Sequence, residues 1–189
     1  MGHMSPNDFE QRYRENPDPW DYEQSNYEQA KYEATLAACG EGPFLNALEL
    51  GGSIGVFTEM LAPRCRRLTT IDVARTAAAM ARRRLADFPQ VQVIRGAIPD
   101  AVPEQQFDLI VASEILYYLT PDDLDRTLGL VRARLVSGGR LVAVHWRPPG
   151  PERPFSAAEV HARLRDDPWL APVHSDESGI YVLDALDRR

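Results

Sequence analysis

Residues 47–55 read Ala-Leu-Glu-Leu-Gly-Gly-Ser-Ile-Gly and join a short apolar run to a turn rich in glycine. The run Leu45–Leu50 predicts a strand, and Ile54, Phe57 and Leu61 then recur at the spacing of a helix. Glycines in such a turn allow positive φ and a close approach of the backbone to a ligand, while the helix start offers unpaired N–H groups. An ordinary tight turn has the same pattern, so this stretch predicts a ligand site only where other motifs agree.

The alternation of strands and helices continues on both sides of this turn. Further strands are predicted at 68–71, 91–94, 107–112 and 140–146. Helices are predicted at 6–15, 25–39, 74–88 and 156–165, and one from Pro121 that ends at Gly138 and Gly139. A hairpin is predicted at 172–186 with its turn near 177–179. Strands separated by such helices imply parallel pairing, so we expect an α/β fold with a ligand site at the carboxyl ends of the strands.

Length and composition predict one soluble domain and narrow its partners. We interpret residues 1–4 as an expression scar, 5–40 as an N-terminal helical lid and 41–189 as the ligand-binding domain. No apolar run approaches the roughly 20 residues that cross a bilayer, so we expect a cytoplasmic protein without membrane contact. The net charge of −7 disfavours nucleic acid as a partner. Cys39 and Cys65 lack the spacing of a zinc site, and no metal is expected.

The basic residues carry little signal at this level. Lys31 is the only lysine among 21 basic residues, a bias that we attribute to codon usage. The run Arg82–Arg84 is interpreted as the solvated face of a helix.

Asp72 follows the predicted strand at 68–71 and lies 21 positions after Gly51. A carboxylate at that place can accept hydrogen bonds from both ribose hydroxyls of an adenosine. The same residue could instead cap the helix that follows. Asp72 and the glycine turn therefore favour an adenosine cofactor without distinguishing S-adenosylmethionine (SAM) from a nicotinamide dinucleotide.

Four motifs, taken in order and spacing, resemble those of class I SAM-dependent methyltransferases. They are the glycine turn at 47–55, Leu-Thr-Thr-Ile-Asp-Val at 68–73, Phe-Asp-Leu-Ile-Val-Ala-Ser-Glu-Ile-Leu-Tyr-Tyr-Leu at 107–119 and Val-Ser-Gly-Gly-Arg-Leu-Val at 136–142. The chain resembles in particular the NodS-like group of nodulation-type N-methyltransferases. Residues 18–22 and 27–32 resemble the lid-forming N-terminus of actinobacterial members. The resemblance implies a single-domain Rossmann-like fold with a seven-stranded, mostly parallel sheet, helices on both faces and a C-terminal antiparallel hairpin strand.

The resemblance also implies SAM as cofactor, S-adenosylhomocysteine (SAH) as its product, and no metal. Carried over residue by residue, it places the methionine part of the cofactor near the glycine turn, the ribose on Asp72 and the adenine against Val73. The family often has an acid after the third strand, but here Ala97 offers only its backbone, so main-chain groups or Asp100 would recognise the adenine. The full set of expected cofactor residues is Trp20, Glu49, Gly51, Gly52, Ser53, Gly55, Asp72, Val73, Ala97, Ile98 and Ser113.

The acceptor is expected where the fourth and fifth strands end. Glu114, Tyr117 and His145 are the candidates for taking the acceptor proton, and the sequence does not choose between them. His145 could equally be a hydrogen-bonded histidine beside the sheet. Trp20, Tyr22 and Tyr27 could form an aromatic lid over the sulfonium or pack the N-terminal helices. His161 and His174 are interpreted as surface residues.

The resulting hypothesis is methyl transfer to a small molecule, with N-methylation of an amino sugar or secondary metabolite as the leading form. O-methylation of a small metabolite and a non-catalytic SAM-binding protein remain as alternatives. A nicotinamide-dependent dehydrogenase would share Asp72 but normally has a fuller GxGxxG motif. The segment Ser113-Glu114-Ile115-Leu116 departs from the motif of DNA amino-methyltransferases, so a nucleic-acid substrate is not expected. The sequence makes no prediction of the oligomeric state.

Overall fold

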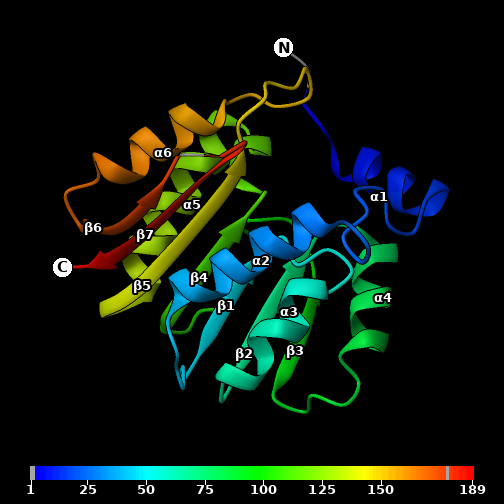
Figure 1. Ribbon diagram of the computed structural model, residues 1–189, viewed down its shortest axis with the longest axis horizontal. Helices are drawn as coiled ribbons and strands as arrows, with labels where there is room; N and C mark the ends of the chain where they lie inside the picture. The colour runs from blue at the N-terminus through cyan, green and yellow to red at the C-terminus, as the bar shows by residue number, and fades with distance from the viewer. Residues whose placement is uncertain (1–2, 178) are drawn as a thin grey trace.

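Seven strands form one sheet in the order β3-β2-β1-β4-β5-β7-β6 (Figure 1). The computed structural model describes residues 3–177 and 179–189. Strands β1 to β5 run parallel, whereas β7 pairs antiparallel with both β5 and β6. The strands are β1 Ala47–Leu50, β2 Leu68–Asp72, β3 Val91–Arg95, β4 Phe107–Ser113, β5 Leu135–Trp146, β6 Leu170–Asp176 and β7 Tyr181–Arg188. The predicted sheet and its C-terminal hairpin are confirmed, although Ser178 of the predicted turn lies outside the described residues.

Alternate residues of the central strands enter two separate cores, one on each face of the sheet. Leu48 and Ile110 face the core that α5 and α6 cover, whereas Ala47 and Leu109 face the core under α2 and α3. This period of two follows from the pleat of a strand, and both faces are apolar because helices cover both. The covering helices are α2 Asn26–Cys39, α3 Val56–Leu61, α5 Pro121–Arg134 and α6 Ala157–Arg165.

The N-terminal segment, by which we mean residues 3–25, crosses the carboxyl end of the sheet. Helix α1 (Pro6–Glu15) begins with a capping box formed by Ser5 and Asp8, and it packs against α4 (Arg75–Arg84). Glu10 accepts hydrogen bonds from the backbone and the hydroxyl of Thr76 at the start of α4, both at 2.9 Å. Two further tethers are ion pairs, Arg12 with Glu152 and Glu23 with Arg84. The sequence interpretation placed Arg84 on a solvated helix face. The structure shows instead that Arg84 anchors the N-terminal segment.

The glycines at 138 and 139 do not end α5, contrary to the prediction. Helix α5 ends at Arg134 and β5 begins with the next residue. Phe107 pairs with Leu135 and Leu109 with Arg140, so the glycines lie in a bulge of β5 opposite a much shorter piece of β4. Gly138 has φ of +74°, which explains why the chain needs glycine inside this strand.

Among the described residues, none of the helices has the length and hydrophobicity required to span a bilayer.

Candidate active site

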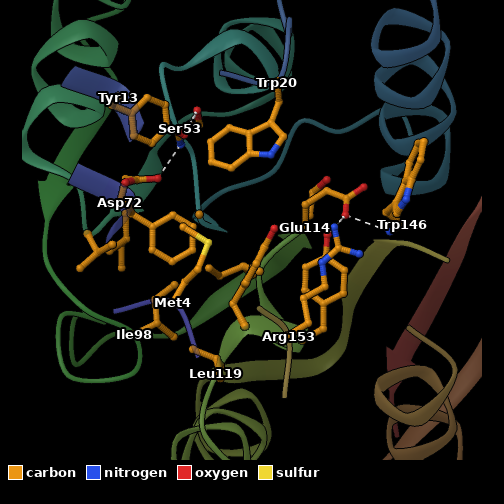
Figure 2. Close-up of a pocket in the computed structure, with 18 of the residues that line it drawn as sticks. Met4, Tyr13, Trp20, Ser53, Asp72, Ile98, Glu114, Leu119, Trp146 and Arg153 are labelled. Carbon is orange, nitrogen blue, oxygen red and sulfur yellow. Dashed lines mark hydrogen bonds between the residues drawn. The ribbon is translucent and has the colours of Figure 1, made fainter. Parts of the chain in front are cut away.

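A cavity of about 390 Å³ opens at the carboxyl ends of β1, β2 and β4, beneath the N-terminal segment (Figure 2). This edge is where a doubly wound sheet reverses its strand order, and the volume is that of a small-molecule site. Figure 2 shows Asp72 and Ile98 toward one end of the cavity and Glu114, Trp146 and Arg153 toward the other. We call these two regions the Asp72 end and the Glu114 end.

The Asp72 end is organised by backbone N–H groups. The Asp72 carboxylate accepts from Ser53 N–H at 2.9 Å and from Ala74 N–H at 2.8 Å. These two bonds use two of its lone-pair positions, and the others remain for a ligand. Burial raises the pKa of Asp72 to about 6, against the lowering effect of the two N–H donors. Gly51 has φ of +81° and a Cβ there would lie 3.0 Å from Ile115, so this turn requires glycine.

Glu49 and Gly52 line a small recess beside the main cavity. A Cβ on Gly52 would lie 1.8 Å from Thr70 Oγ1, so a larger residue requires the Thr70 side chain to shift. The buried Glu49 accepts from Thr58 Oγ1, and burial raises the pKa of Glu49. Gly55 lines neither space; its φ is +87° and a Cβ would lie 3.2 Å from Ala81, so it allows α3 to approach α4. Its expected contact with the cofactor stays a prediction, and the structure gives Gly55 a packing role.

Apolar and aromatic side chains complete the Asp72 end. Val73 and Ile98 line one wall with Met4, which lies 5% exposed inside the cavity. The hydroxyl of the buried Tyr13 pairs with Ser53 Oγ. Trp20 stacks edge-on against Tyr13 with ring centroids 5.5 Å apart.

Asp100, expected as a possible adenine partner, does not line the cavity. Its carboxylate is mostly exposed and pairs with Arg126. The loop that follows β3 therefore turns this acid to solvent, while Ala97 and Ile98 line the cavity.

The Glu114 end is centred on one carboxylate with three donors. Glu114 Oε1 accepts from Lys31 Nζ at 2.8 Å, and Oε2 accepts from Trp146 N–H at 2.9 Å and from the Tyr117 hydroxyl. Burial and the charge of Glu114 raise the pKa of Tyr117, so its phenol stays protonated and donates. Glu114 itself has φ of +59°, a backbone conformation rare outside glycine, which turns its side chain back over the strand ends.

Lys31 is a candidate functional residue that the sequence interpretation missed. Its side chain is 2% exposed and pairs with both Glu28 and Glu114 at 2.8 Å. Burial opposes its charge, but the two carboxylates raise the pKa of Lys31 above its usual value. Tyr27 and Tyr32 flank the ammonium at 5.5 and 5.9 Å. The signal available in the sequence was that a chain otherwise using arginine keeps one lysine, three positions after a glutamate on a helix that we expected to cover a site.

The remaining wall comes from the end of β5 and the loop after it. Trp146 packs edge-on against Tyr27 with ring centroids 5.2 Å apart. Arg153 stacks over the Tyr117 ring at 4.3 Å and donates to the Pro148 carbonyl at 2.9 Å. The Arg12–Glu152 ion pair ties this loop to α1, so the two covers of the cavity are joined.

His145 does not border the cavity, contrary to the prediction. Its ring is fully buried, and Nε2 accepts from Leu116 N–H while Nδ1 pairs with His161. Burial lowers the pKa of His145 well below its usual value, so the ring is neutral. His161 is 1% exposed and paired with Asp184, which corrects its interpretation as a surface residue; His174 is exposed as expected. The β5 alternation turns residue 145 into the core and residue 146 toward the ligand side.

The structure brings most of the predicted residues together around one space. The main cavity is lined by Trp20, Gly51, Ser53, Asp72, Val73, Ala97, Ile98, Ser113, Glu114 and Tyr117. It is also lined by residues that the sequence interpretation did not select, among them His3, Met4, Phe9, Tyr13, Glu28, Lys31, Leu119, Asp123 and Arg153. Within the described chain, no group of three or more potential metal ligands is arranged to hold a metal ion.

Comparison with solved structures gives the fold its class. The chain matches the N-methyltransferase NodS from Bradyrhizobium japonicum WM9 in complex with SAH with a TM-score of 0.88 and 26% identity, covering 98% of this chain and 99% of that one. A methyltransferase structure from Pseudomonas syringae, described as putative, matches at a TM-score of 0.75 with 36% identity, over 86% of this chain and 99% of that one. These matches confirm the expected class I methyltransferase fold.

Comparison of sequences identifies the family. Nodulation protein S of Sinorhizobium fredii is 42% identical over 103 residues, which are 54% of this chain and 48% of that protein. Nodulation protein S of Rhizobium tropici is 37% identical over 127 residues, 66% of this chain and 53% of that protein. The chain thus spans about half the length of the curated relatives that it matches. The model of the family Nodulation protein S (NodS) matches residues 5–140, and the chain belongs to this family.

Proposed function

We propose that this chain is a SAM-dependent methyltransferase that transfers a methyl group to the amine of a small molecule. The observation that carries the proposal is the continuous cavity between Asp72 and Glu114 at the switch point of the sheet. The Asp72 end has the groups that suit an adenosine. The Glu114 end has a carboxylate that suits a hydrogen-bond donor, such as the amine of the methyl acceptor. Membership of the NodS family and the SAH-bound NodS structure support the choice of SAM over a nicotinamide cofactor.

The residues at the Asp72 end fit SAM in shape and in hydrogen-bonding capacity. The ionised Asp72 has lone pairs free for both ribose hydroxyls. Val73 and Ile98 offer an apolar slot for a purine ring, and the Ala97 and Ile98 backbone can replace the missing acid. Gly51 and Ser53 line the cavity where the methionine part would lie. When bound, SAM supplies an activated methyl group on a sulfonium with a good leaving group.

The residues at the Glu114 end would orient the acceptor and hold its proton. The three donors on Glu114 leave lone pairs for one further donor, such as an N–H of the acceptor. Tyr117 is a donor to this carboxylate and not a base, because its pKa is raised. Trp146, Tyr27 and the Arg153–Tyr117 stack exclude water around the acceptor. Proximity and orientation, in a site closed by residues 5–40, would then account for most of the catalysis.

An amine is favoured over a hydroxyl because the group that faces the acceptor at the Glu114 end is a carboxylate. An alcohol is a weaker nucleophile and needs fuller deprotonation, which a carboxylate already bonded to Lys31 supplies poorly. O-methylation and a non-catalytic role remain as the competing hypotheses. The amino-sugar identity of the acceptor rests on family membership alone.

The test is methyl transfer to a panel of small primary amines and their hydroxyl analogues, measured as SAH release. We expect turnover with amines, and a fall of roughly 100-fold in rate for Glu114→Gln, or a rise mainly in the acceptor KM if Glu114 only orients the amine. Glu33→Gln, which removes an exposed carboxylate of α2, is the control. Binding of SAH without turnover on the panel favours the non-catalytic protein, and binding of NADH in its place would overturn the cofactor.

A further inference from the structure

A chain of buried hydrogen bonds runs from the loop after β4, through β5 and α6, to β7. Leu116 N–H donates to His145 Nε2 at 3.1 Å, and His145 Nδ1 lies 3.0 Å from His161 Nε2. His161 Nδ1 lies 2.6 Å from Asp184, which also accepts two bonds from Arg165 at 2.8 and 3.0 Å. His145, His161 and Asp184 are each at most 1% exposed. We call these three residues the His–His–Asp relay.

The relay permits only one arrangement of protons. The backbone N–H of Leu116 can only donate, so His145 Nε2 must carry no proton. A neutral His145 then carries its proton on Nδ1 and donates it to His161 Nε2. His161 in turn carries its proton on Nδ1 and donates it to the Asp184 carboxylate. Every group is satisfied with both rings neutral, and Arg165 pairs with the Asp184 carboxylate as well as with Glu177.

The first bond of the relay holds the loop that presents Glu114. Leu116 lies two residues after Glu114 and begins the 3-10 helix Leu116–Tyr118. The hydroxyl of Tyr117, in that same turn, donates to the Glu114 carboxylate. Glu114 has positive φ, a conformation that persists only where the surroundings fix the backbone on both sides. On the strand side its N–H is bonded to the Val144 carbonyl, and on the loop side the Leu116 N–H is bonded to His145.

We infer that the His–His–Asp relay is a positioning device for the acceptor site, in which an Nδ1-protonated His145 fixes the backbone at Leu116 and so the direction of Glu114. His145 is thus a positioning residue that touches neither the cavity nor the acceptor. Its effect on catalysis rests on the proposed function, whereas its proton arrangement does not. Arg165, Asp184 and His161 serve to orient the ring of His145, as a carboxylate orients a histidine through its second nitrogen.

The proton arrangement can be read without any substrate. In ¹⁵N-labelled protein, two-bond ¹H–¹⁵N correlation spectra distinguish a ring protonated at Nδ1 from one protonated at Nε2. We expect the Nδ1–H form for both His145 and His161 at pH 7.5, with exposed His174 as the internal control. An Nε2–H form or a protonated ring at His145 overturns the inference.

A matched pair of substitutions tests what the relay does. The amide of Gln reaches about as far as Nε2, so His145→Gln can still accept from Leu116 N–H but loses His161. The amide of Asn reaches only as far as Nδ1, so His145→Asn can still donate to His161 but leaves Leu116 N–H without a partner. Each variant breaks one buried hydrogen bond. A merely structural role therefore predicts that the two variants lose stability and activity to the same extent.

We expect hydrogen exchange at the Leu116 amide to be at least tenfold faster in His145→Asn than in His145→Gln. With an amine acceptor, we expect kcat/KM at least tenfold lower for the Asn variant than for the Gln variant, with SAH affinities of the two within threefold. Equal exchange, or equal kinetics with turnover present, overturns the positioning role. Absence of turnover in the parent protein counts against the proposed function only, because the spectra and the exchange rates still decide the relay.

Discussion

The two ends of the cavity are built in different ways. At the Asp72 end, the carboxylate is fixed by N–H groups of Ser53 and Ala74, which belong to the loops after two neighbouring strands. At the Glu114 end, the carboxylate is fixed by Lys31 from α2, by Tyr117 from its own loop and by the N–H of Trp146 at the end of β5. Backbone N–H donors are present whatever side chains surround them. The Lys31–Glu114 ion pair, in contrast, depends on two particular side chains.

This difference separates a site built from local strand and turn geometry from one built by the packing of distant segments. The Asp72 end uses strand, turn and helix geometry that a class I methyltransferase fold already contains. The Glu114 end depends on how the N-terminal helices and the loop after β5 are placed over the sheet. We therefore expect changes at the Glu114 end to affect folding and acceptor choice together, and changes at the Asp72 end to affect mainly the cofactor.

The largest effect is expected for Lys31→Met. The substitution leaves Glu28 and Glu114 without their buried cation, which costs roughly 3 kcal/mol of unfolding free energy. Urea unfolding measures the loss, and adding Glu28→Gln and Glu114→Gln to the variant is expected to recover at least half of it. Arg126→Met, which breaks exposed ion pairs, is the control with little change. A Lys31→Met protein as stable as the parent would mean that the two carboxylates need no cation.

The next effect is expected for Gly52→Ala, in the recess between the two ends. A methyl group there overlaps Thr70 Oγ1 and approaches Glu49, so we expect a loss of about 2 kcal/mol in stability and weaker SAH binding. Gly129→Ala is the matched control, because a Cβ at that position of α5 meets open space and is expected to stabilise the protein by about 0.5–1 kcal/mol. Thermal unfolding of both variants measures the contrast, and equal shifts would show that the recess is not tightly packed.

A smaller effect is expected for Asp72→Asn, confined to the cofactor. Removing the charged acceptor is expected to weaken SAH binding at least tenfold by calorimetry, with little loss of fold. In the parent protein the pKa of Asp72 is raised to about 6, so the ionised form that the proposed ribose contact needs is lost as the pH falls through 6. We therefore expect SAH affinity to be constant above about pH 7 and to fall by roughly tenfold per pH unit well below 6.

Asp72→Asn is expected to remove that dependence on pH. Asp125→Asn, a change of an exposed carboxylate, is the control and is expected to keep it. If the Asn variant retains the same fall in affinity below pH 6, another group governs the pH dependence.

The smallest effect is expected for Asp100→Ala. The side chain is 70% exposed and paired with Arg126 outside the cavity, so we expect a change below about 0.5 kcal/mol in stability and no change in SAH affinity. Calorimetry with SAH checks this. A loss of affinity of threefold or more would return Asp100 to the role of adenine partner.

The sequence predicted the Asp72 end well because its determinants are local. A strand, a glycine turn and an acid after the next strand lie within 26 residues, from Ala47 to Asp72, and each follows from backbone geometry. The starts of the helices at 6–15 and 26–39 were likewise predictable, because Ser5 and Ser25 cap them. Glu114 was predictable as the residue that ends an apolar strand.

The Glu114 end could not be predicted in the same way because its partners are distant in the chain. Lys31 and Glu114 are 83 positions apart, and no periodicity indicates which face of α2 the sheet receives. His145 follows an apolar strand as Glu114 does, yet the strand alternation turns it into the core. The glycines in β5 were misread because Gly138 has positive φ, a conformation found in a bulge as well as at a helix end.

The ion pairs that hold the N-terminal segment have a consequence for how ligands enter and leave the cavity. Tyr13 and Trp20 hold this segment by packing, but the Arg12–Glu152 and Glu23–Arg84 pairs hold it by charge at partly exposed positions. Such pairs are screened over about 8 Å at physiological ionic strength. The rate at which the segment opens is therefore expected to rise with ionic strength. The contacts between the bound ligand and the interior of the cavity are expected to change little. Ligand entry and release would then respond to the salt content of the medium, a property set by the rim of the cavity and not by its interior.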